Sequence, residues 1–210
     1  MLDKCSKLEN IPYTLGLFLG DGHLSTSNIR IVNLDKDSLE YSCYEINRQF
    51  NTSYEVKAIG KYWRVNYGIK EIVSLFSEFL DCKNIPDYVY DFSLKAKKEF
   101  VAGLMDADGY ISKGKTKWKG NRYQMGFVST KMAQQLKTFL KNGLGCRTGS
   151  ITLKSNHKIN KKWEKCYQLY IPVIAFIESG LYFYCSRKQK RVEQYKTEIL
   201  KTLESSETTC

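Results

Sequence analysis

An internal repeat constrains this chain more than any other feature of its 210 residues. The segment Leu15–Ser25 (LGLFLGDGHLS) recurs as Ala102–Ser112 (AGLMDADGYIS), and Asp21 and Asp108 occupy the same place in the two copies, 87 positions apart. Self-similarity at such a spacing indicates two copies of one supersecondary unit. The chain is therefore expected to fold as two similar halves.

The same order of elements follows each copy of the repeat. After the first copy the hydrophobic pattern predicts a short hairpin, a helix, a second hairpin and a helix, over Leu24–Val32, Asp35–Phe50, Tyr54–Tyr67 and Ile69–Leu80. After the second copy it predicts the same series with longer hairpins, over Ile111–Thr130, Met132–Leu144, Thr148–Ile171 and Val173–Gly180. We therefore expect the two halves to be residues 1–80 and 95–186, joined by a linker at 81–94 and followed by a terminal helix and tail at 187–210.

The composition is typical of a globular protein, with 42% hydrophobic and 26% charged residues and only 3 prolines. No apolar stretch approaches the roughly 20 residues of a membrane span, and the polar start lacks the apolar core of a signal peptide. We expect an intracellular protein with no membrane partner, in the cytoplasm of a prokaryotic or phage-infected cell or in an organelle. The 7 cysteines show no metal-ligand spacing, which argues against a zinc ribbon or a disulfide framework.

Positive charge is concentrated in the second half of the chain. Residues 95–210 hold 23 Lys and Arg against 9 Asp and Glu, a net charge of +14, whereas residues 1–94 hold 10 against 13, and the total is +11. A basic excess of this size points to a polyanionic partner, although a solvated basic face is the alternative for charge alone. The basic residues alternate on predicted strands instead of lining an amphipathic helix, so nucleic acid fits better than a membrane surface.

Small residues four positions apart line one face of each repeated helix. They are Gly16 and Gly20 in the first copy and Gly103 and Ala107 in the second. Such residues let two helix backbones approach closely. The two repeated helices are therefore expected to pack on each other.

Each repeated helix ends at an Asp-Gly pair, and Gly22 and Gly109 suit the left-handed conformation just past a helix end. If the helices pair about a pseudo-twofold axis, Asp21 and Asp108 become neighbours. Two carboxylates beside helix C-terminal carbonyls make an oxygen-only site for hard divalent cations such as Mg²⁺. Two metals at such a site can stabilise the attacking and leaving oxygens of phosphodiester displacement. A cap and turn would explain one isolated Asp-Gly pair, but it explains poorly a motif that occurs twice with the same elements after it.

The strands can be divided into a core face and a groove face, because alternate residues of a half-buried strand point to opposite sides. The expected core residues are Trp63, Val65, Tyr67, Tyr123, Met125 and Phe127. Polar side chains in the other phase are expected to face a groove, and they are Lys57, Tyr62, Arg64, Asn66, Arg122, Gln124 and Gln168. Arg, Asn and Gln are the side chains that contact base edges through two hydrogen bonds.

Four lysines in the long hairpin are spaced by two positions: Lys113, Lys115, Lys117 and Lys119. On a strand this spacing predicts a single lysine face suited to DNA phosphates. A solvent-exposed strand edge protected by lysines is the alternative.

The segment Val101–Gly109 (VAGLMDADG) resembles the signature of the LAGLIDADG homing endonucleases in seven of nine positions, and Thr14–Gly22 resembles the more divergent first copy of two-motif members. The resemblance implies an α+β monomer of two pseudo-symmetric αββαββα repeats. Their two antiparallel sheets would form a saddle over double-stranded DNA, around a central pair of packed helices.

The same resemblance implies a site-specific endonuclease that makes a double-strand break in a long, asymmetric duplex by Mg²⁺-dependent phosphodiester hydrolysis. Mn²⁺ is expected to substitute for Mg²⁺, and Ca²⁺ to bind without supporting cleavage. An RNA-binding maturase acting on intron RNA, or a non-cleaving DNA-binding regulator, is the alternative on the same fold. Loss of either acid would favour that alternative, and both acids are present.

Family roles carry over residue by residue. Asp21 and Asp108 match the metal-binding catalytic acids, and the carbonyls of Gly20 and Ala107 match further metal ligands. Asp106, which Leu19 replaces in the first copy, is not catalytic in the family and is expected to be structural.

The family also places a basic residue near the scissile phosphates after the last helix of each half. Lys83 and Lys188 match that place, with an ordinary solvated lysine as the alternative for each. Residues at the ends of the second strands are expected to hold a metal-bound water or contact the DNA backbone, and they are Asn33 and either Ser129 or Thr130.

Overall fold

The computed structural model of the chain describes residues 2–77, 84–116, 120–129, 132–153 and 165–207, with the side chains at 2–5, 114–116, 120–122 and 202–207 left aside. The first half consists of α1 (Leu2–Glu9), α2 (Pro12–Asp21), β1 (Gly22–Leu24), β2 (Ile29–Asn33), α3 (Lys36–Phe50), β3 (Lys57–Ile59), β4 (Tyr62–Tyr67) and α4 (Lys70–Ser77). A 3₁₀ helix, η1 (Asp87–Asp91), leads to the second half. That half consists of α5 (Leu94–Asp108), β5 (Gly109–Thr116), β6 (Gly120–Ser129), α6 (Ala133–Leu144), β7 (Ile151–Leu153), β8 (Tyr167–Ile171), α7 (Val173–Glu178) and the long α8 (Ser186–Glu207).

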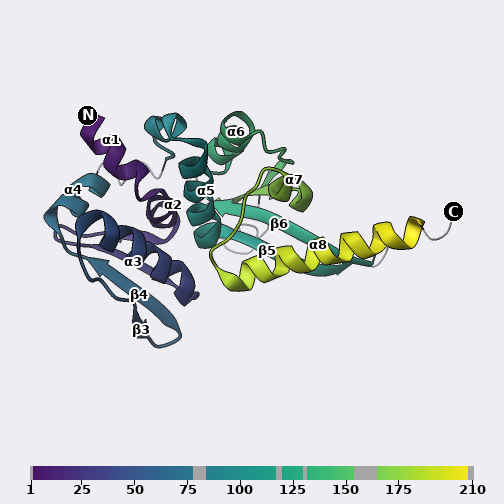
Figure 1. Cartoon of the computed structure of the whole chain (residues 1–210), viewed down its shortest axis with the longest axis horizontal. Coiled ribbons are helices and arrows are strands. Elements are labelled where there is room, and N and C mark those ends of the chain that lie inside the picture. Colours follow the sequence, from purple (N-terminus) through teal and green to yellow (C-terminus); the bar gives the residue numbers. More distant parts are fainter. Residues whose placement is uncertain (1, 78–83, 117–119, 130–131, 154–164, 208–210) are drawn as a thin grey trace.

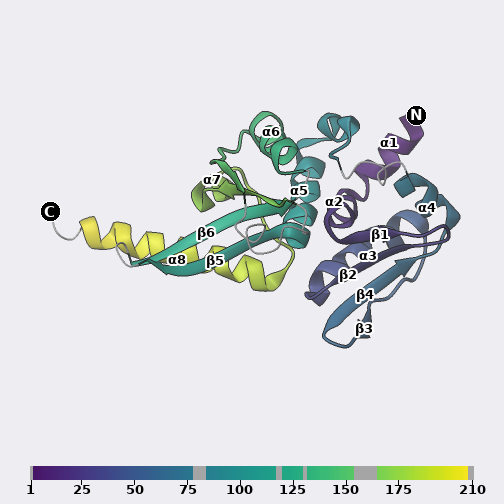
Figure 2. The ribbon, with the colours of Figure 1, turned by 180° about the vertical axis from the view of Figure 1, so that it is seen from behind.

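The two halves repeat one topology. Each contains a four-stranded antiparallel sheet, and the strand orders β1-β2-β4-β3 and β5-β6-β8-β7 are equivalent. The register is also equivalent, since Gly22 pairs with Ile31 in the first sheet and Gly109 pairs with Phe127 in the second. The two sheets lie on opposite sides of α2 and α5 (Figures 1 and 2). The α+β fold of two similar halves is therefore confirmed.

The helices α2 and α5 form the central packed pair. A Cβ atom added to Gly16 would lie 2.0 Å from the Phe100 carbonyl oxygen, and one added to Gly103 would lie 2.1 Å from the Tyr13 carbonyl oxygen. The two backbones therefore touch at these glycines, and no side chain fits between them. Residues 12–19 of α2 are all buried, as expected for a helix that is apolar all round.

A carboxylate from α3 holds the N-terminus of α2. Glu45 accepts hydrogen bonds from the main-chain N–H groups of Tyr13 at 3.3 Å and Thr14 at 2.7 Å, and from the Thr14 hydroxyl at 2.7 Å. These bonds satisfy donors that a helix start leaves without an intrahelical partner. Burial nevertheless raises the pKa of Glu45 to about 8.

The glycines after α2 and α5 differ from the prediction. Gly22 (φ −78°, ψ 146°) and Gly109 (φ −81°, ψ 155°) are extended, so the expected left-handed conformation is wrong. Each helix runs directly into a strand, which requires extended backbone at the junction. Glycine suits these positions because there is no room for a side chain. An added Cβ would lie 2.1 Å from the Phe18 ring at Gly22 and 2.4 Å from the Met105 carbonyl oxygen at Gly109.

The structure contains two helices beyond those expected. The sequence patterns did not predict α1, in which Leu8 is buried, or the 3₁₀ helix η1 within the linker. The terminal helix α8 is the longest helix and extends beyond the second sheet (Figure 1). None of the helices in the described part of the chain is both long enough and apolar enough to cross a membrane.

Candidate active site and nucleic-acid interface

The two repeated aspartates lie at the same end of the central helix pair. Asp21 is the last residue of α2 and Asp108 is the last residue of α5, and both are half-buried. A Cβ added to Gly20 would lie 2.3 Å from the Ala107 Cβ and 3.3 Å from Oδ2 of Asp108. The Asp108 carboxylate is therefore next to the last turn of the opposite helix.

A pocket of about 360 Å³ opens at this end of the helix pair. The first half contributes Asp21, Asn33, Asp35 and Tyr62 to its wall, and the second half contributes Asp106, Ala107 and residues 109–112. Three basic residues from the first turns of α8 also line it, and they are Arg187, Lys188 and Arg191. Acidic and basic side chains from the two halves therefore meet in one cavity.

Asn33 orients the carboxylate of Asp21. The Asn33 Nδ2 donates a 2.8 Å hydrogen bond to Oδ2 of Asp21, and its Oδ1 accepts one of 2.8 Å from the Asp35 N–H. By register Ser129 is the equivalent residue of the second half, but its hydroxyl accepts a hydrogen bond from the Met132 N–H at 3.0 Å, at the start of α6. The two sites are therefore not symmetric. Thr130 lies outside the described residues.

Asp106 is buried beneath the pocket. Its Oδ2 accepts hydrogen bonds from the Tyr13 hydroxyl at 2.8 Å and from the N–H groups of Tyr184 and Cys185, both at 3.0 Å. Burial raises its pKa to about 6. The carboxylate thus joins α5 to α2 and to the segment before α8, an arrangement that suits the structural role expected for it.

Lys188 is almost fully buried, at 6% exposure, and its Nζ donates to the carbonyl oxygens of Met105 at 2.9 Å and Asp106 at 2.7 Å. Desolvation lowers the pKa of this lysine. A cation at the C-terminal carbonyls of α5 is favoured by the helix dipole. Lys188 therefore lies in the pocket, hydrogen-bonded to the C-terminal carbonyls of α5, and is not a solvated lysine. Lys83 lies outside the described residues.

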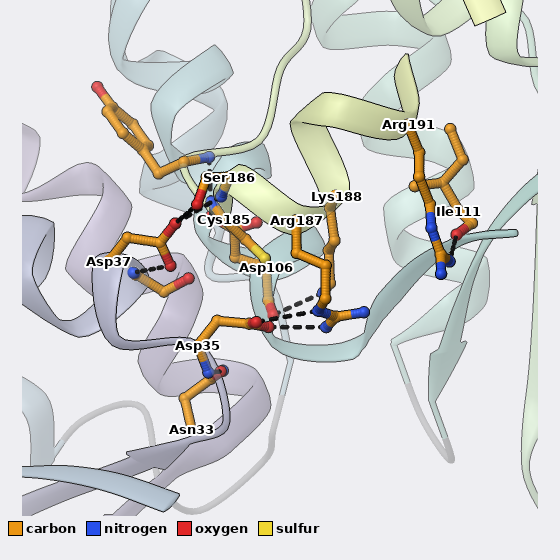
Figure 3. A network of polar contacts seen from close by, with 12 residues as sticks. Asn33, Asp35, Asp37, Asp106, Ile111, Cys185, Ser186, Arg187, Lys188 and Arg191 are labelled. Carbon is orange, nitrogen blue, oxygen red and sulfur yellow. Dashed lines mark hydrogen bonds and ion pairs between the residues drawn. The ribbon is translucent and has the colours of Figure 1, made fainter. Parts of the chain in front are cut away.

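Arg191 is a basic residue of the pocket that the sequence analysis missed. Its Nη1 donates to the carbonyl oxygen of Ile111, on the strand that follows Asp108 (Figure 3). The spacing of Arg187, Lys188 and Arg191 along one helix face was a usable signal, because residues three or four apart on a helix are neighbours.

The first turn of α8 also crosses to the first half. Arg187 forms two hydrogen bonds with the Asp35 carboxylate, and Ser186 donates from both its N–H and its hydroxyl to Oδ2 of Asp37. Figure 3 shows these contacts beside Asp106 and Lys188. The end of the second half is therefore bonded directly to the loop that follows Asn33 and to the first turn of α3.

The donor set at the helix ends fits a hard divalent cation. It comprises the carboxylates of Asp21 and Asp108 and the carbonyls of the last helical turns, including Gly20 and Ala107, which lack intrahelical partners. In the described part of the chain no group of three or more His, Cys, Asp or Glu side chains gathers. Mg²⁺ is usually bound through one or two carboxylates together with waters and substrate phosphates. Asp21 on the pocket wall and Asp108 at the end of the neighbouring helix supply two carboxylates for binding of that kind.

The first sheet has an open polar face. Val65 and Tyr67 are buried and Trp63 is half-buried, as expected, so Tyr62, Arg64 and Asn66 point the other way. Lys57 is the cross-strand neighbour of Arg64 and shares its face.

Arg30 belongs to the same open face and was missed. It pairs across the strands with Asn66, and its Nε donates to Oδ1 of Asn66 at 3.3 Å. The alternation of buried Ile29 and Ile31 around it could have indicated this position.

The second sheet repeats the division into two faces. Tyr123, Met125 and Phe127 are buried, as expected, and Gln124 is exposed on the other side. Gln168 Nε2 donates to the Tyr110 hydroxyl at 2.5 Å. Tyr110 lies over Gly126, where an added Cβ would be 2.9 Å from the tyrosine oxygen. Because Gly126 is equivalent by register to Arg30, the two sheets present different groups at equivalent positions.

The expectation that Lys113 belongs to a lysine face for DNA phosphates is wrong. Lys113 pairs with Glu198 of α8 and lies 5.1 Å from the centroid of the Tyr123 ring, on the face that α8 covers. Lys113 lies two positions after buried Ile111 on the same strand, so the two side chains share one face. The burial of Ile111 therefore indicates the direction of Lys113 better than the lysine spacing does. The other side chains assigned to this hairpin lie outside the described part, and they are Lys115, Lys117, Lys119 and Arg122.

Comparison with known proteins establishes the fold. No protein-family model matches the sequence, and no curated protein matches it significantly. The structure is similar to the homing endonuclease I-DmoI in complex with DNA and Mn, with a TM-score of 0.53 and 17% identity, covering 82% of this chain and 96% of that one. It is also similar to an I-DmoI variant with its target DNA in the presence of Mg, with a TM-score of 0.52 and 19% identity, covering 84% and 97%.

A third similar structure is the N-terminal LAGLIDADG domain of DUF199/WhiA, with a TM-score of 0.50 and 16% identity, covering 82% of this chain and 81% of that one. The likeness extends over most of both chains in all three cases. The chain therefore has the LAGLIDADG fold.

Proposed function

We propose that this protein is a monomeric, site-specific DNA endonuclease that hydrolyses both strands of an asymmetric duplex with the help of Mg²⁺. One observation carries the proposal: the pocket at the ends of α2 and α5 holds carboxylate and basic groups between two sheets with open polar faces. The similar I-DmoI structures with DNA and divalent metals support the same reading.

In the proposed reaction Asp21 and Asp108 would hold Mg²⁺, with the carbonyls of Gly20 and Ala107 as further ligands. A bound Mg²⁺ would supply Lewis-acid activation of water and stabilisation of negative charge at the phosphate. Asn33 keeps the Asp21 carboxylate in one orientation through its 2.8 Å hydrogen bond. The guanidinium of Arg191 and the ammonium of Lys188 supply fixed positive charge where the phosphate charge increases.

The open sheet faces supply DNA affinity and sequence preference in this proposal. In the first half the groups are Lys57, Tyr62, Arg64, Asn66 and Arg30, and in the second they are Gln124 and Gln168. The guanidinium of Arg30 is oriented from one side by Asn66. A guanidinium held in this way can present its remaining N–H groups to O6 and N7 of guanine.

Arg30→Ala is expected to relax sequence preference at one base pair under the first sheet. The loss of a bidentate contact should reduce discrimination there by about 1–3 kcal/mol. Competition binding against the preferred duplex and its single-base variants would measure this. Lys61→Ala, in the β3–β4 turn, is the control and should change affinity without changing base preference. Retention of full discrimination at every position by the Arg30 variant would contradict its assignment to base readout.

The experiment for the function itself separates binding from cleavage. Duplexes from a random pool are selected on the protein in Ca²⁺, which satisfies oxygen ligands with looser geometry, and the selected duplex is then incubated in Mg²⁺ or Mn²⁺. We expect one non-palindromic site to be enriched in Ca²⁺ and cut on both strands in Mg²⁺. Enrichment without cleavage would favour the non-cleaving regulator, and preference for structured RNA over duplex DNA would favour the maturase.

A further inference from the structure

We propose that Arg187 is a positioning residue for the Asp21 carboxylate and acts across the boundary between the halves through Asp35 and Asn33. The inference rests on the proposed function, since it concerns the geometry of one of the two proposed metal-binding acids. Arg187 would not touch the reacting phosphate in this role. It would fix the loop from which Asn33 holds Asp21.

The first link joins the two halves. Arg187, in the first turn of α8, donates from Nε to Oδ1 of Asp35 at 3.0 Å and from Nη2 to Oδ2 at 2.8 Å. Two parallel bonds of this kind fix the relative orientation of both groups. The Asp35 side chain is largely covered, at 15% exposure, and the hydrogen bonds from Arg187 hold its pKa below the usual range.

The second link runs from the main chain of Asp35 to Asp21. The Asp35 N–H donates to Oδ1 of Asn33, and Asn33 is buried, at 7% exposure. Because the amide oxygen accepts this bond, the other side of the amide must present its NH₂ group. That group donates to Oδ2 of Asp21 at 2.8 Å. The Asp35 N–H therefore fixes which side of the Asn33 amide faces Asp21.

The loop between these links is short, and its apolar side chain is exposed. β2 ends at Asn33 and α3 begins at Lys36, and Leu34 between them is 55% exposed. Asp35 occupies the N-cap position of α3, but its side chain makes no capping hydrogen bond. The ion pair with Arg187 is therefore the described contact that best anchors this side chain (Figure 3).

The first test reads the amide directly, in protein without metal or DNA. Side-chain ¹⁵N spectra of the full chain would identify the Asn33 NH₂ signals by their loss in Asn33→Ala. We expect these signals to shift or broaden in Arg187→Ala and in Asp35→Asn, which breaks the same ion pair from the other side. Arg147→Ala, which breaks the exposed Arg147–Glu178 pair of the second half, is the control and should leave them unchanged. Unchanged Asn33 signals in both test variants would overturn the proposal, whatever the protein does to DNA.

The second test measures cleavage at saturating protein, with binding in Ca²⁺ measured separately. A misplacement of about 1 Å at a reacting centre can cost a factor of about 100 in rate. We expect Arg187→Ala to cut about 10- to 100-fold more slowly with unchanged affinity, and Arg187→Ala with Asn33→Ala to be no slower than Asn33→Ala alone. Rate losses that multiply in the double variant would overturn the proposal by showing that Arg187 acts independently of Asn33. Reduced affinity with a changed salt dependence would overturn it by showing that Arg187 contacts DNA itself. A parental protein that cuts no duplex would contradict the proposed function and leave the spectra to decide on Arg187.

Discussion

Asp21→Asn and Asp108→Asn are each expected to reduce double-strand cleavage by a factor of about 100 to 1000 or more, because each removes a group that organises charge stabilisation at the scissile phosphates. Neither substitution changes the shape of the helix ends or the open faces of the sheets. Binding of the selected duplex in Ca²⁺ should therefore remain close to that of the parent. Single-turnover cleavage in Mg²⁺ and equilibrium binding in Ca²⁺ are the two measurements.

Asp91→Asn is the matched control for these variants. It removes an exposed carboxylate from η1, outside the pocket, and should leave both measurements unchanged. Parental rates of cutting on both strands by either the Asp21 or the Asp108 variant would contradict a site shared by the two acids.

Gly16→Leu and Gly103→Leu are expected to lower the free energy of unfolding by about 1–3 kcal/mol or more. At each position an added Cβ alone would lie within about 2 Å of a carbonyl oxygen of the facing helix, so the backbones must separate. That separation would expose core surface shared by both halves. Urea unfolding measures the loss as a lower midpoint concentration of urea, provided that the slope of the free energy against urea stays the same.

Gly68→Ala is the control for the packing variants, because no atom lies within 4 Å of a Cβ added there. Its midpoint should be close to that of the parent. Parental midpoints for both leucine variants would show that α2 and α5 do not pair through these faces.

The features that the sequence predicts well are those encoded locally and repeated. The order of elements after Asp21 is repeated after Asp108, so the hydrophobic pattern of each half supports the elements predicted for the other. The burial of Val65, Tyr67 and Met125 followed from alternation along single strands.

The strand face of Lys113 is set by its apolar neighbours and not by the lysine spacing. Lysines two positions apart do share a strand face, but buried Ile111 fixes which face that is. Glu198, which pairs with Lys113, lies 85 positions further along the chain. Local spacing contains no information about such a partner.

The polar network of the pocket could not be predicted for the same reason. Asp35 and Arg187 are 152 positions apart, and Tyr13 and Asp106 are 93 apart. Asp35 meets Arg187 because the segment after α7 returns to the helix pair, and Tyr13 meets Asp106 because α2 packs on α5. Asn33 was identified as a site residue from its place at a strand end, but its contact with Asp21 required the register between β1 and β2.

Metal-dependent cutting by the two acids is measured by sequencing the ends released from a random duplex pool in Mg²⁺, with the parent and the Asp21→Asn, Asp108→Asn double variant compared under the same conditions. We expect paired breaks on both strands at one asymmetric sequence with the parent, and none with the double variant, although the same sequence is bound by both in Ca²⁺. Paired breaks made equally by the double variant, or a bound sequence that the parent never cuts, would contradict this expectation.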